Sequence, residues 1–365
     1  MTNQPKCAKI IISKGKELDM KQKTKKNLII TSIVLGSILL IYLILLLFPR
    51  IDNYKGENPM RKDGELPILI AHGGGNKEFP DNTLEAFYNA YSVDNRVMME
   101  TDVSITKDGV VLLSHDTTID RKTNATGNIH EWNYSDLIAQ EIDFGYTNPT
   151  DKDDKLNGER KKFKGADGLE KTPLDVEYPE GVSPRHETVF LATTLEDLLV
   201  CFPKNKINVE IKQSGELGLK CFEAVLVLLE KYNAYDRVVL ASFHDELYQT
   251  YLSYIKDDKV PDGFMCSPGT DGVTKYVILR LLGLDVFFGD KMCVFQLPTE
   301  EEAAGITFDL STKALIRNAH RHNLAVHYWT INDKEEMREL LEMGADGIMT
   351  DYPHRLKEVY DSYNK

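Results

Sequence analysis

The sequence predicts an α/β fold built as a (β/α)8 barrel, with an inserted loop region and one membrane-spanning helix before it. Two observations predict the barrel and its insertion: short apolar runs alternate with amphipathic stretches over roughly 300 residues, and one long stretch lacks apolar periodicity. A third, an apolar run near the N-terminus, predicts the membrane helix. The length of 365 residues, with 42% hydrophobic and 28% charged residues, excludes a disordered or fibrous protein.

The apolar run extends over Leu28–Phe48. Its length matches the roughly 20 residues that a helix needs to cross a bilayer. Residues 1–26 carry eight lysines against two acidic residues, a net charge of +6, and few basic residues follow the run. This excess predicts a cytoplasmic N-terminus, a single-pass helix over 27–48 in the cell membrane, and a body on its outer side. A cleaved signal peptide is the alternative, but no small-x-small cleavage site follows.

The chain beyond the helix is acidic. Subtracting +6 from the total of −13 leaves −19 for the remainder. Such a body is not expected to bind nucleic acid, because nucleic-acid binders need a basic face. We expect a polar tether over 49–65 and one barrel domain over 66–365.

Strand-like and helix-like segments alternate along this body, which predicts parallel strands with crossover helices. The expected strands are Ile68–Ala71, Met98–Ser104, Val110–Ser114, Ile207–Ile211, Val238–Ser242, Val294–Gln296, Ala325–Trp329 and Gly347–Met349. The expected helices include Thr83–Tyr91, Leu195–Val200, Gly215–Tyr232, Thr312–His322 and Lys334–Met343. Asp81 or Asn82 is the expected N-terminal cap of the first helix.

An insertion at about 143–190 interrupts the alternation. Nearly all of it, Asp143–Glu187, is rich in charge, glycine and proline, and it is too long for an ordinary barrel connection. It is expected to form either a small lid near the site or a solvated loop.

Two histidines end apolar strands. His72 follows Ile68–Ala71 and precedes three glycines, the first being Gly73, which permit close backbone approach to a ligand. His115 ends Val110–Ser114. The carboxyl ends of barrel strands form the active-site face, so the two imidazoles are expected there as a general base and a general acid. Either histidine alone is more often structural.

Acidic residues are also paired along strands. Glu100 and Asp102 point to one strand face, and Glu210 shares a face with Lys212. Carboxylates aimed at one point repel each other unless a cation lies between them, and hard divalent cations take such ligands. We interpret the three carboxylates as metal ligands and Lys212 as a charge for a phosphate. A surface acidic pair and an internal salt bridge are the alternatives. Trp329 is either a wall of the pocket or ordinary core.

Taken in order, these segments resemble the glycerophosphodiester phosphodiesterase family, whose members have a TIM-barrel fold. The family's AHRG-like start and P-E-N-T, E-x-D, H-D, E-x-K and G-A-D-G-I-x-T-D stretches are matched, over about residues 67–355, by Ala71–Gly74, Pro80–Thr83, Glu100–Asp102, His115–Asp116, Glu210–Lys212 and Gly344–Asp351. No single piece is specific, but their joint occurrence in this order is.

The resemblance implies hydrolysis of glycerophosphodiesters to glycerol 3-phosphate and an alcohol. It implies that His72 and His115 form the acid/base pair and that Lys212 binds phosphate. It also implies a divalent cofactor, Ca²⁺ or Mg²⁺ with Mn²⁺ as a further candidate, held by Glu100, Asp102 and Glu210. Trp329 and the backbone of Gly73 are the further expected substrate contacts. The insertion after His115 resembles one that this family often carries.

Two departures from the family pattern bear on the substrate. Gly73 stands where the family usually has an arginine that contacts phosphate, and Lys77 or Lys212 is a candidate to replace part of that charge. Asp81 stands where the family usually has glutamate. Since the metal and histidine sets are intact, we expect an active enzyme.

Four other functions are alternatives to this hypothesis. A lysophospholipase D or a hydrolase of poly(glycerol phosphate), such as teichoic acid, would use the same site on another substrate. A non-catalytic phosphodiester-binding module would use it without turnover. Phospholipase C-like cleavage of phosphoinositides is disfavoured by the E-x-D and E-x-K pieces.

Overall fold

The structure is a computed structural model, and it describes residues 5–62, 64–152, 155–303 and 305–363. The chain forms two compact units. The first contains Met1–Arg50 together with Leu279–Phe288, and the second contains Ile51–Ile278 together with Gly289–Lys365.

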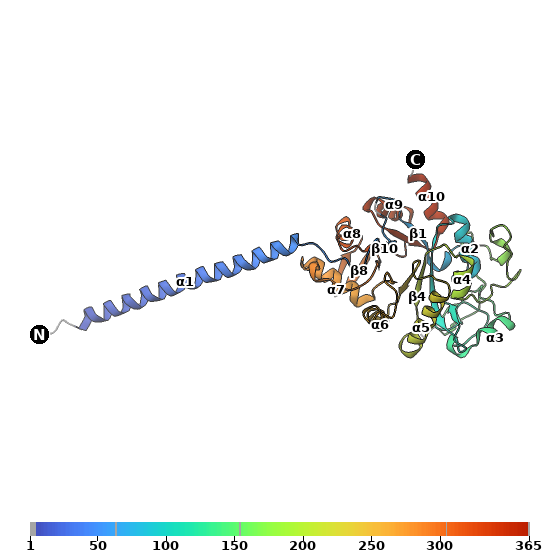
Figure 1. Cartoon of the computed structure of the whole chain (residues 1–365), viewed down its shortest axis with the longest axis horizontal. Coiled ribbons are helices and arrows are strands. Elements are labelled where there is room, and N and C mark those ends of the chain that lie inside the picture. The colour runs from blue at the N-terminus through green and yellow to red at the C-terminus, as the bar shows by residue number, and fades with distance from the viewer. Residues whose placement is uncertain (1–4, 63, 153–154, 304, 364–365) are drawn as a thin grey trace. The chain divides into compact units, whose positions relative to one another are not determined.

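The first unit is built on one long helix, α1 (Pro5–Leu47) (Figure 1). Its part Gln22–Leu47 is long and apolar enough to cross a membrane, as the sequence predicted. The segment Leu279–Phe288 packs on the last turns of α1: the Tyr42 hydroxyl donates to the carbonyl of Leu282 over 3.1 Å. A buried Arg50 guanidinium also donates two hydrogen bonds, 2.5 and 2.9 Å long, to Asp285.

The second unit is a barrel of eight parallel strands. In order around the barrel they are β1 (Ile68–Ala71), β2 (Met98–Ile105), β4 (Ile207–Ile211), β5 (Val238–Ala241), β6 (Met265–Cys266), β7 (Val294–Leu297), β10 (Ala325–Tyr328) and β11 (Gly347–Thr350). β11 pairs with β1, and the remaining gap is bridged where the Cys293 amide donates to the Cys266 carbonyl over 3.0 Å. The predicted fold class is therefore confirmed.

The helices lie around the outside of the strands (Figure 1). They are α2 (Leu84–Val93), α4 (Leu195–Cys201), α5 (Gly215–Lys231), α6 (Asp245–Lys256), α7 (Thr270–Leu281), α8 (Lys313–His320), α9 (Lys334–Met343) and α10 (Pro353–Tyr363). The helices α6, α7 and α10 have no counterpart among the helices predicted by name from the sequence. The cap expected at Asp81 or Asn82 is formed instead by Thr83, whose hydroxyl accepts from the Ala86 amide over 3.2 Å.

One predicted barrel strand belongs elsewhere. The segment Val110–Ser114 contains β3 (Val111–Leu113), which pairs antiparallel with β2 and lies outside the barrel order. The connection from β2 is a five-residue turn over 106–110, whereas a parallel crossover needs a dozen or more residues. The strand that takes its place in the barrel is β6, whose two residues are too short for a periodicity signal. A separate hairpin of β8 (Glu300–Ala303) and β9 (Ile306–Asp309) precedes α8.

Residues 51–62 pack against the amino-terminal end of the barrel. Met60 is fully buried among side chains of β1, β5, β7 and β10, and Tyr54 joins the same cluster. The Asn58 side chain donates to the carbonyls of Cys293 and Asn323, each over 2.7 Å. The mainly polar composition of this segment predicted a tether. The segment nevertheless contains two apolar side chains buried against the barrel and one buried amide that donates hydrogen bonds to backbone carbonyls.

The insertion has little regular secondary structure, but short antiparallel bridges and hydrogen bonds hold it together. It follows η2 (Ile129–Glu131) and α3 (Tyr134–Ala139) and contains η3 (Pro173–Asp175). Antiparallel bridges join Tyr146 to Lys162 and Lys164 to Glu170. Asp143 accepts from the amides of Gly145 and Phe190, so the two ends of the insertion are tied together by one buried carboxylate.

We expect Met60→Ala in the full chain to lower the free energy of unfolding by ~2–5 kcal/mol, because it leaves a cavity in a packed cluster. Urea denaturation followed by tryptophan fluorescence measures this loss. Leu169→Ala is the matched control, since Leu169 is 64% exposed and should change stability by less than ~0.5 kcal/mol. An equal effect of both substitutions would contradict the packing of this segment.

Candidate active site

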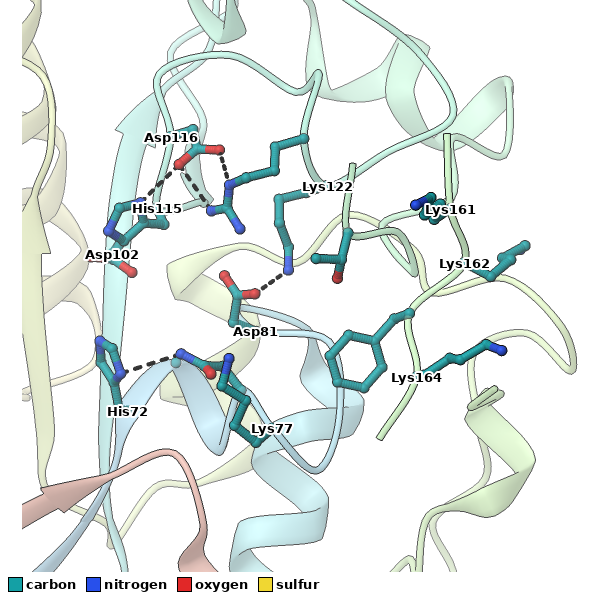
Figure 2. Close-up of a pocket in the computed structure, with 15 residues that line it drawn as sticks. His72, Lys77, Asp81, Asp102, His115, Asp116, Lys122, Lys161, Lys162 and Lys164 are labelled. Atoms are coloured by element: carbon teal, nitrogen blue, oxygen red, sulfur yellow. Dashed lines mark hydrogen bonds and ion pairs between the residues drawn. The ribbon is translucent and has the colours of Figure 1, made fainter. Parts of the chain in front are cut away.

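A pocket of about 680 Å³ opens at the carboxyl ends of β1 and β2. Figure 2 shows His72, His115 and Asp102 on one side of it and the lysines of the insertion on the other. The residues that line it are His72, Gly73, Asn76, Lys77, Asp81, Asp102, His115, Asp116, Arg121, Lys122, Thr147, Lys161, Lys162, Phe163 and Lys164. The two histidines that the sequence separated by more than forty residues are thus brought into one cavity.

His72 begins η1 (His72–Gly74), the turn that directly follows β1. Its Nδ1 lies 2.7 Å from the carboxylate of Asp351, which comes directly after β11, and Asn332 donates to the other oxygen of that carboxylate over 2.8 Å. Burial opposes the charged imidazolium, but the hydrogen bond to Asp351 and the charge of Glu100 raise the pKa of His72 to about 10. The pairing of β1 with β11 is what brings His72 and Asp351 together.

His115 has a similar partner beside it in the chain. Its Nδ1 lies 2.8 Å from Asp116, and Arg121 holds that carboxylate with two hydrogen bonds of 2.6 and 2.9 Å. The hydrogen bond to Asp116 raises the pKa of His115. Burial alone would raise the pKa of Asp116, but its bonds with His115 and Arg121 hold it at about 2. Asp116 is therefore a fixed negative charge behind the imidazole.

Glu100, Asp102 and Glu210 form one acidic cluster on β2 and β4. Their register places Asp102 opposite Glu210, and one oxygen of each of the three lies within 4.8 Å of the others. The Asn82 amide donates to Asp102 over 3.0 Å, while its carbonyl accepts from the Asp102 amide over 3.1 Å. The Gly73 amide donates to Glu100 over 2.8 Å. Backbone and side-chain donors thus hold two of the three carboxylates in place.

This cluster fits a divalent cation. Two oxygens bound to one ion at about 2.4 Å lie at most about 4.8 Å apart, and the three oxygens here lie within that limit. Burial and the charge of Asp102 raise the pKa of Glu100 to about 8, and burial also raises the pKa of Glu210. A cation among the three oxygens would remove that repulsion. The oxygen-only donor set suits Ca²⁺, Mg²⁺ or Mn²⁺.

Lys212 adjoins this cluster. Its Nζ lies 2.9 Å from Glu210 and 3.5 Å from Asp102, and these charges raise its pKa although burial opposes the shift. The ammonium also lies 5.9 Å from the ring centre of Phe243, which is 54% exposed. Trp329 packs edge-on against Phe243 at 5.7 Å. Trp329 does not line the pocket itself, so its expected substrate contact stays a prediction.

Gly73 is buried at φ +55°, where a side chain would be strained, and an added Cβ would lie 2.8 Å from the Cβ of Asp81. Asp81 forms a buried ion pair with Lys122. Burial opposes the charge of Asp81, but Lys122 and Arg121 hold its pKa below the usual range. The positive charge absent at position 73 is therefore present in the pocket on residues that follow His115, in addition to the predicted Lys77.

The sequence missed several residues of this site. Arg121 and Lys122 lie in an irregular loop without a periodic signal, and Asn82 was interpreted as a helix cap. In the sequence Asp351 is visible only as the end of the Gly344–Asp351 motif, and its contact with His72 depends on strand pairing.

The chain matches the model of the "Glycerophosphoryl diester phosphodiesterase family" over residues 72–355. It belongs to this family. The chain is therefore a phosphodiesterase, as the motif order implied.

Relatives with similar sequences carry names of related enzymes. A probable glycerophosphodiester phosphodiesterase 2 from Mycobacterium tuberculosis is 25% identical over 297 residues, which are 80% of this chain and 90% of the relative. A human lysophospholipase D is 24% identical over 349 residues, 90% of this chain and 96% of the relative.

Solved structures agree in fold. A glycerophosphoryl diester phosphodiesterase domain from Mycobacterium tuberculosis has a TM-score of 0.60 at 16% identity, covering 80% of this chain and 99% of the domain. An Oleispira antarctica phosphodiesterase, solved with sn-glycerol-3-phosphate, has a TM-score of 0.55 at 19% identity, covering 81% and 97%.

We expect Asp116→Asn to lower the pKa of His115, because the hydrogen bond to this carboxylate is the main cause that raises it. A nuclear magnetic resonance titration of the His115 ring measures the shift. Glu131→Gln, which removes an exposed charge outside the pocket, should leave the His115 pKa unchanged. A His115 pKa that is the same in Asp116→Asn as in the unmodified protein would contradict the assigned role of Asp116.

Proposed function

We propose that the protein hydrolyses glycerophosphodiesters to glycerol 3-phosphate and an alcohol, with His72 and His115 as the acid/base pair and a divalent cation at Glu100, Asp102 and Glu210. One observation carries the proposal: two carboxylate-backed histidines lie in the same pocket as Asp102, a member of a three-carboxylate cluster of single-ion dimensions. Family membership supplies the reaction class.

The ring atoms suit proton transfer. Nδ1 of each histidine is engaged with a carboxylate, so Nε2 is the atom left to exchange a proton with the substrate. One histidine takes the proton of the attacking hydroxyl, from water or from the glycerol 2-hydroxyl, and the other protonates the leaving alkoxide. Attack by the glycerol hydroxyl gives a cyclic phosphate that water then opens.

The remaining groups orient the phosphate. When bound, a divalent cation supplies positive charge beside the phosphate oxygens on which negative charge builds. Lys212 presents an ammonium at the same place, and Asn82 fixes the rotamer of Asp102. These residues hold the diester so that its leaving oxygen meets a histidine Nε2.

A lysophospholipase D reaction is the second candidate. The exposed ring of Phe243, backed by Trp329 and next to Lys212, offers an apolar surface near the phosphate site. Among the described residues that line the pocket, however, Phe163 is the one large apolar side chain. The charged lining favours a polar head group over an acyl chain.

We further propose that α1 anchors the enzyme in the cell membrane, with its N-terminus in the cytoplasm and the barrel outside. The support is the apolar span Gln22–Leu47 and the lysine excess before it.

We expect chelation by EDTA to abolish release of glycerol 3-phosphate from glycerophosphocholine, and Ca²⁺, Mg²⁺ or Mn²⁺ to restore it. Glu210→Gln should weaken metal binding, measured by calorimetry, by at least ~10-fold, since a ligand contributes no less than the residues that orient it. Full activity in EDTA together with unchanged metal binding in Glu210→Gln would contradict the metal site.

The histidines are tested in the same assay. His115→Ala should lower kcat by ~100- to 10,000-fold. His186→Ala is the control, because His186 accepts backbone hydrogen bonds within the insertion and is not among the residues that line the pocket. Hydrolysis that survives in His115→Ala would remove His115 from catalysis, and an inactive unmodified protein with every metal would favour the binding module.

The orientation of α1 predicts that trypsin added to intact cells degrades an epitope placed after the barrel and spares an epitope placed before α1. Immunoblotting of both epitopes measures this. Cells opened with detergent provide the control, in which both epitopes are lost. Protection of the C-terminal epitope in intact cells would place the barrel in the cytoplasm.

A further inference from the structure

An apolar surface lies exposed beside the carboxyl-terminal end of α1. It is formed by Leu281, Leu282 and Phe287, which are 59%, 54% and 63% exposed, together with the exposed side chains of Leu47 and Phe48. All five belong to the first compact unit. Large apolar side chains gathered on a surface mark a contact with another protein or with lipid.

The segment Leu279–Phe288 is packed closely on α1. Gly283 adopts φ +66°, and a Cβ at this position would lie 2.6 Å from the hydroxyl oxygen of Tyr42 and 2.7 Å from Leu46. The backbone therefore approaches the helix at a distance that only glycine permits. The hydrogen bond of 3.1 Å from the Tyr42 hydroxyl to the Leu282 carbonyl lies at the same place.

The segment carries little charge. Its ten residues include two charged side chains, Arg280 and Asp285. The side chain of Asp285 is 3% exposed and forms an ion pair with Arg50, whose side chain is 1% exposed. Arg280 lies in the last turn of α7, and an arginine can keep its apolar stem in a hydrophobic layer while its guanidinium reaches polar groups.

The backbone of the segment also supplies its own hydrogen-bond partners. Four of its carbonyls accept from amides of the same segment over 2.8 to 3.0 Å, and a fifth accepts from Tyr42. The five carbonyls belong to Leu279, Arg280, Leu282, Leu284 and Asp285. Irregular backbone is tolerated next to lipid only where its polar groups have such partners, so this turn suits an apolar environment.

The bond to Tyr42 fixes the depth of the segment. Tyr42 precedes Leu47, the last residue of the apolar span, by five residues. At 1.5 Å per residue, its Cα lies about 7 Å inside the end of the span. Interfacial segments bury their apolar face by about 5–10 Å at the boundary between headgroups and acyl chains. A carbonyl bonded to Tyr42 therefore lies at interfacial depth when α1 crosses a membrane.

We propose that Leu279–Phe288 is a second membrane contact, which inserts its exposed side chains into the leaflet that holds the carboxyl-terminal end of α1. The partner is the lipid bilayer: acyl chains meet Leu281, Leu282 and Phe287, and headgroup phosphates meet Arg280. The proposal rests on the proposed anchoring by α1 and goes beyond it. The chain meets the bilayer again 240 residues after Tyr42, in the connection between α7 and β7.

The test uses the full chain in vesicles of phosphatidylcholine and phosphatidylglycerol. Cys7 and Cys201 are first replaced by serine, and the other three cysteines are buried. A nitroxide is then attached to Leu281→Cys or to Phe287→Cys. Paramagnetic resonance measures its collisions with oxygen, which enters the bilayer, and with a nickel chelate, which stays in water. We expect both labels to favour oxygen, at a depth of about 5–10 Å.

Two labelled controls fix the scale. Ile38→Cys lies within the apolar span and is 57% exposed, so its label should favour oxygen if α1 crosses the bilayer. Leu169→Cys is the matched control, because Leu169 is an equally exposed leucine in the insertion, and its label should favour the chelate. The ratio of oxygen to chelate collisions at Leu281 and Phe287 should exceed that at Leu169 by at least ~5-fold.

The outcomes separate this proposal from the anchor. A label at Ile38 that favours oxygen, with labels at Leu281 and Phe287 that match Leu169, would leave the anchor standing and overturn the second contact. Labels at Leu281 and Phe287 that are shielded from both reagents would show a protein cover, such as a second copy of the chain, and would also overturn it. An aqueous label at Ile38 would overturn the anchor and the second contact together.

Hydrolysis is measured on the same labelled proteins. None of the labelled positions is among the residues that line the pocket, so release of glycerol 3-phosphate should stay within ~2-fold of the unlabelled protein. Retained hydrolysis shows that the labelled chains are folded. Hydrolysis with aqueous labels at Leu281 and Phe287 would leave the reaction standing without the membrane contact. Oxygen-favouring labels on a chain that hydrolyses nothing would leave the contact standing without the reaction.

Discussion

The mutual repulsion of Glu100, Asp102 and Glu210 is the constraint around which the site is built. Three carboxylates, two of them buried and that of Glu210 partly buried, with oxygens within 4.8 Å of one another are unfavourable unless cations face them, and burial together with the charge of Asp102 raises the pKa of Glu100. Lys212 and His72 partly offset the negative charge, and Asn82 and the Gly73 amide fix the geometry. A barrel can bear such a cluster because strands paired on both sides hold each carboxylate rigidly.

The two departures from the family motif, Gly73 and Asp81, meet at one place in the structure. Gly73 adopts a positive φ with Asp81 against it, and Asp81 is paired with a buried Lys122. An arginine at 73 would need both a different backbone and a displaced Asp81. At this place the positive charge is supplied by Lys122, in the loop after His115, and not by residue 73. We therefore expect substrate contacts on that loop and on the insertion to contribute more to binding than contacts at position 73.

The insertion is connected by hydrogen bonds to the loop that follows His115. Its ends are tied by Asp143, and its ribbon is fixed to the loop after His115 through Asn148. The same loop holds Arg121, which fixes Asp116 behind His115. The insertion is therefore linked through a short chain of hydrogen bonds to His115, the proposed acid/base residue.

Local periodicity and the order of motifs along the chain were enough to predict the barrel and the apolar helix, and they also named His72, Glu100, Asp102, His115 and Glu210 as candidate site residues. It mistook Val110–Ser114 for a barrel strand and missed β6, since strand direction depends on connection length and two residues carry no period. Only the tertiary structure paired Asp351 with His72, turned Asn82 toward Asp102 and brought Lys161 over the pocket. Those contacts join segments 20 to 279 residues apart, or lie in loops without regular pattern, and no local rule encodes which of many polar side chains will meet.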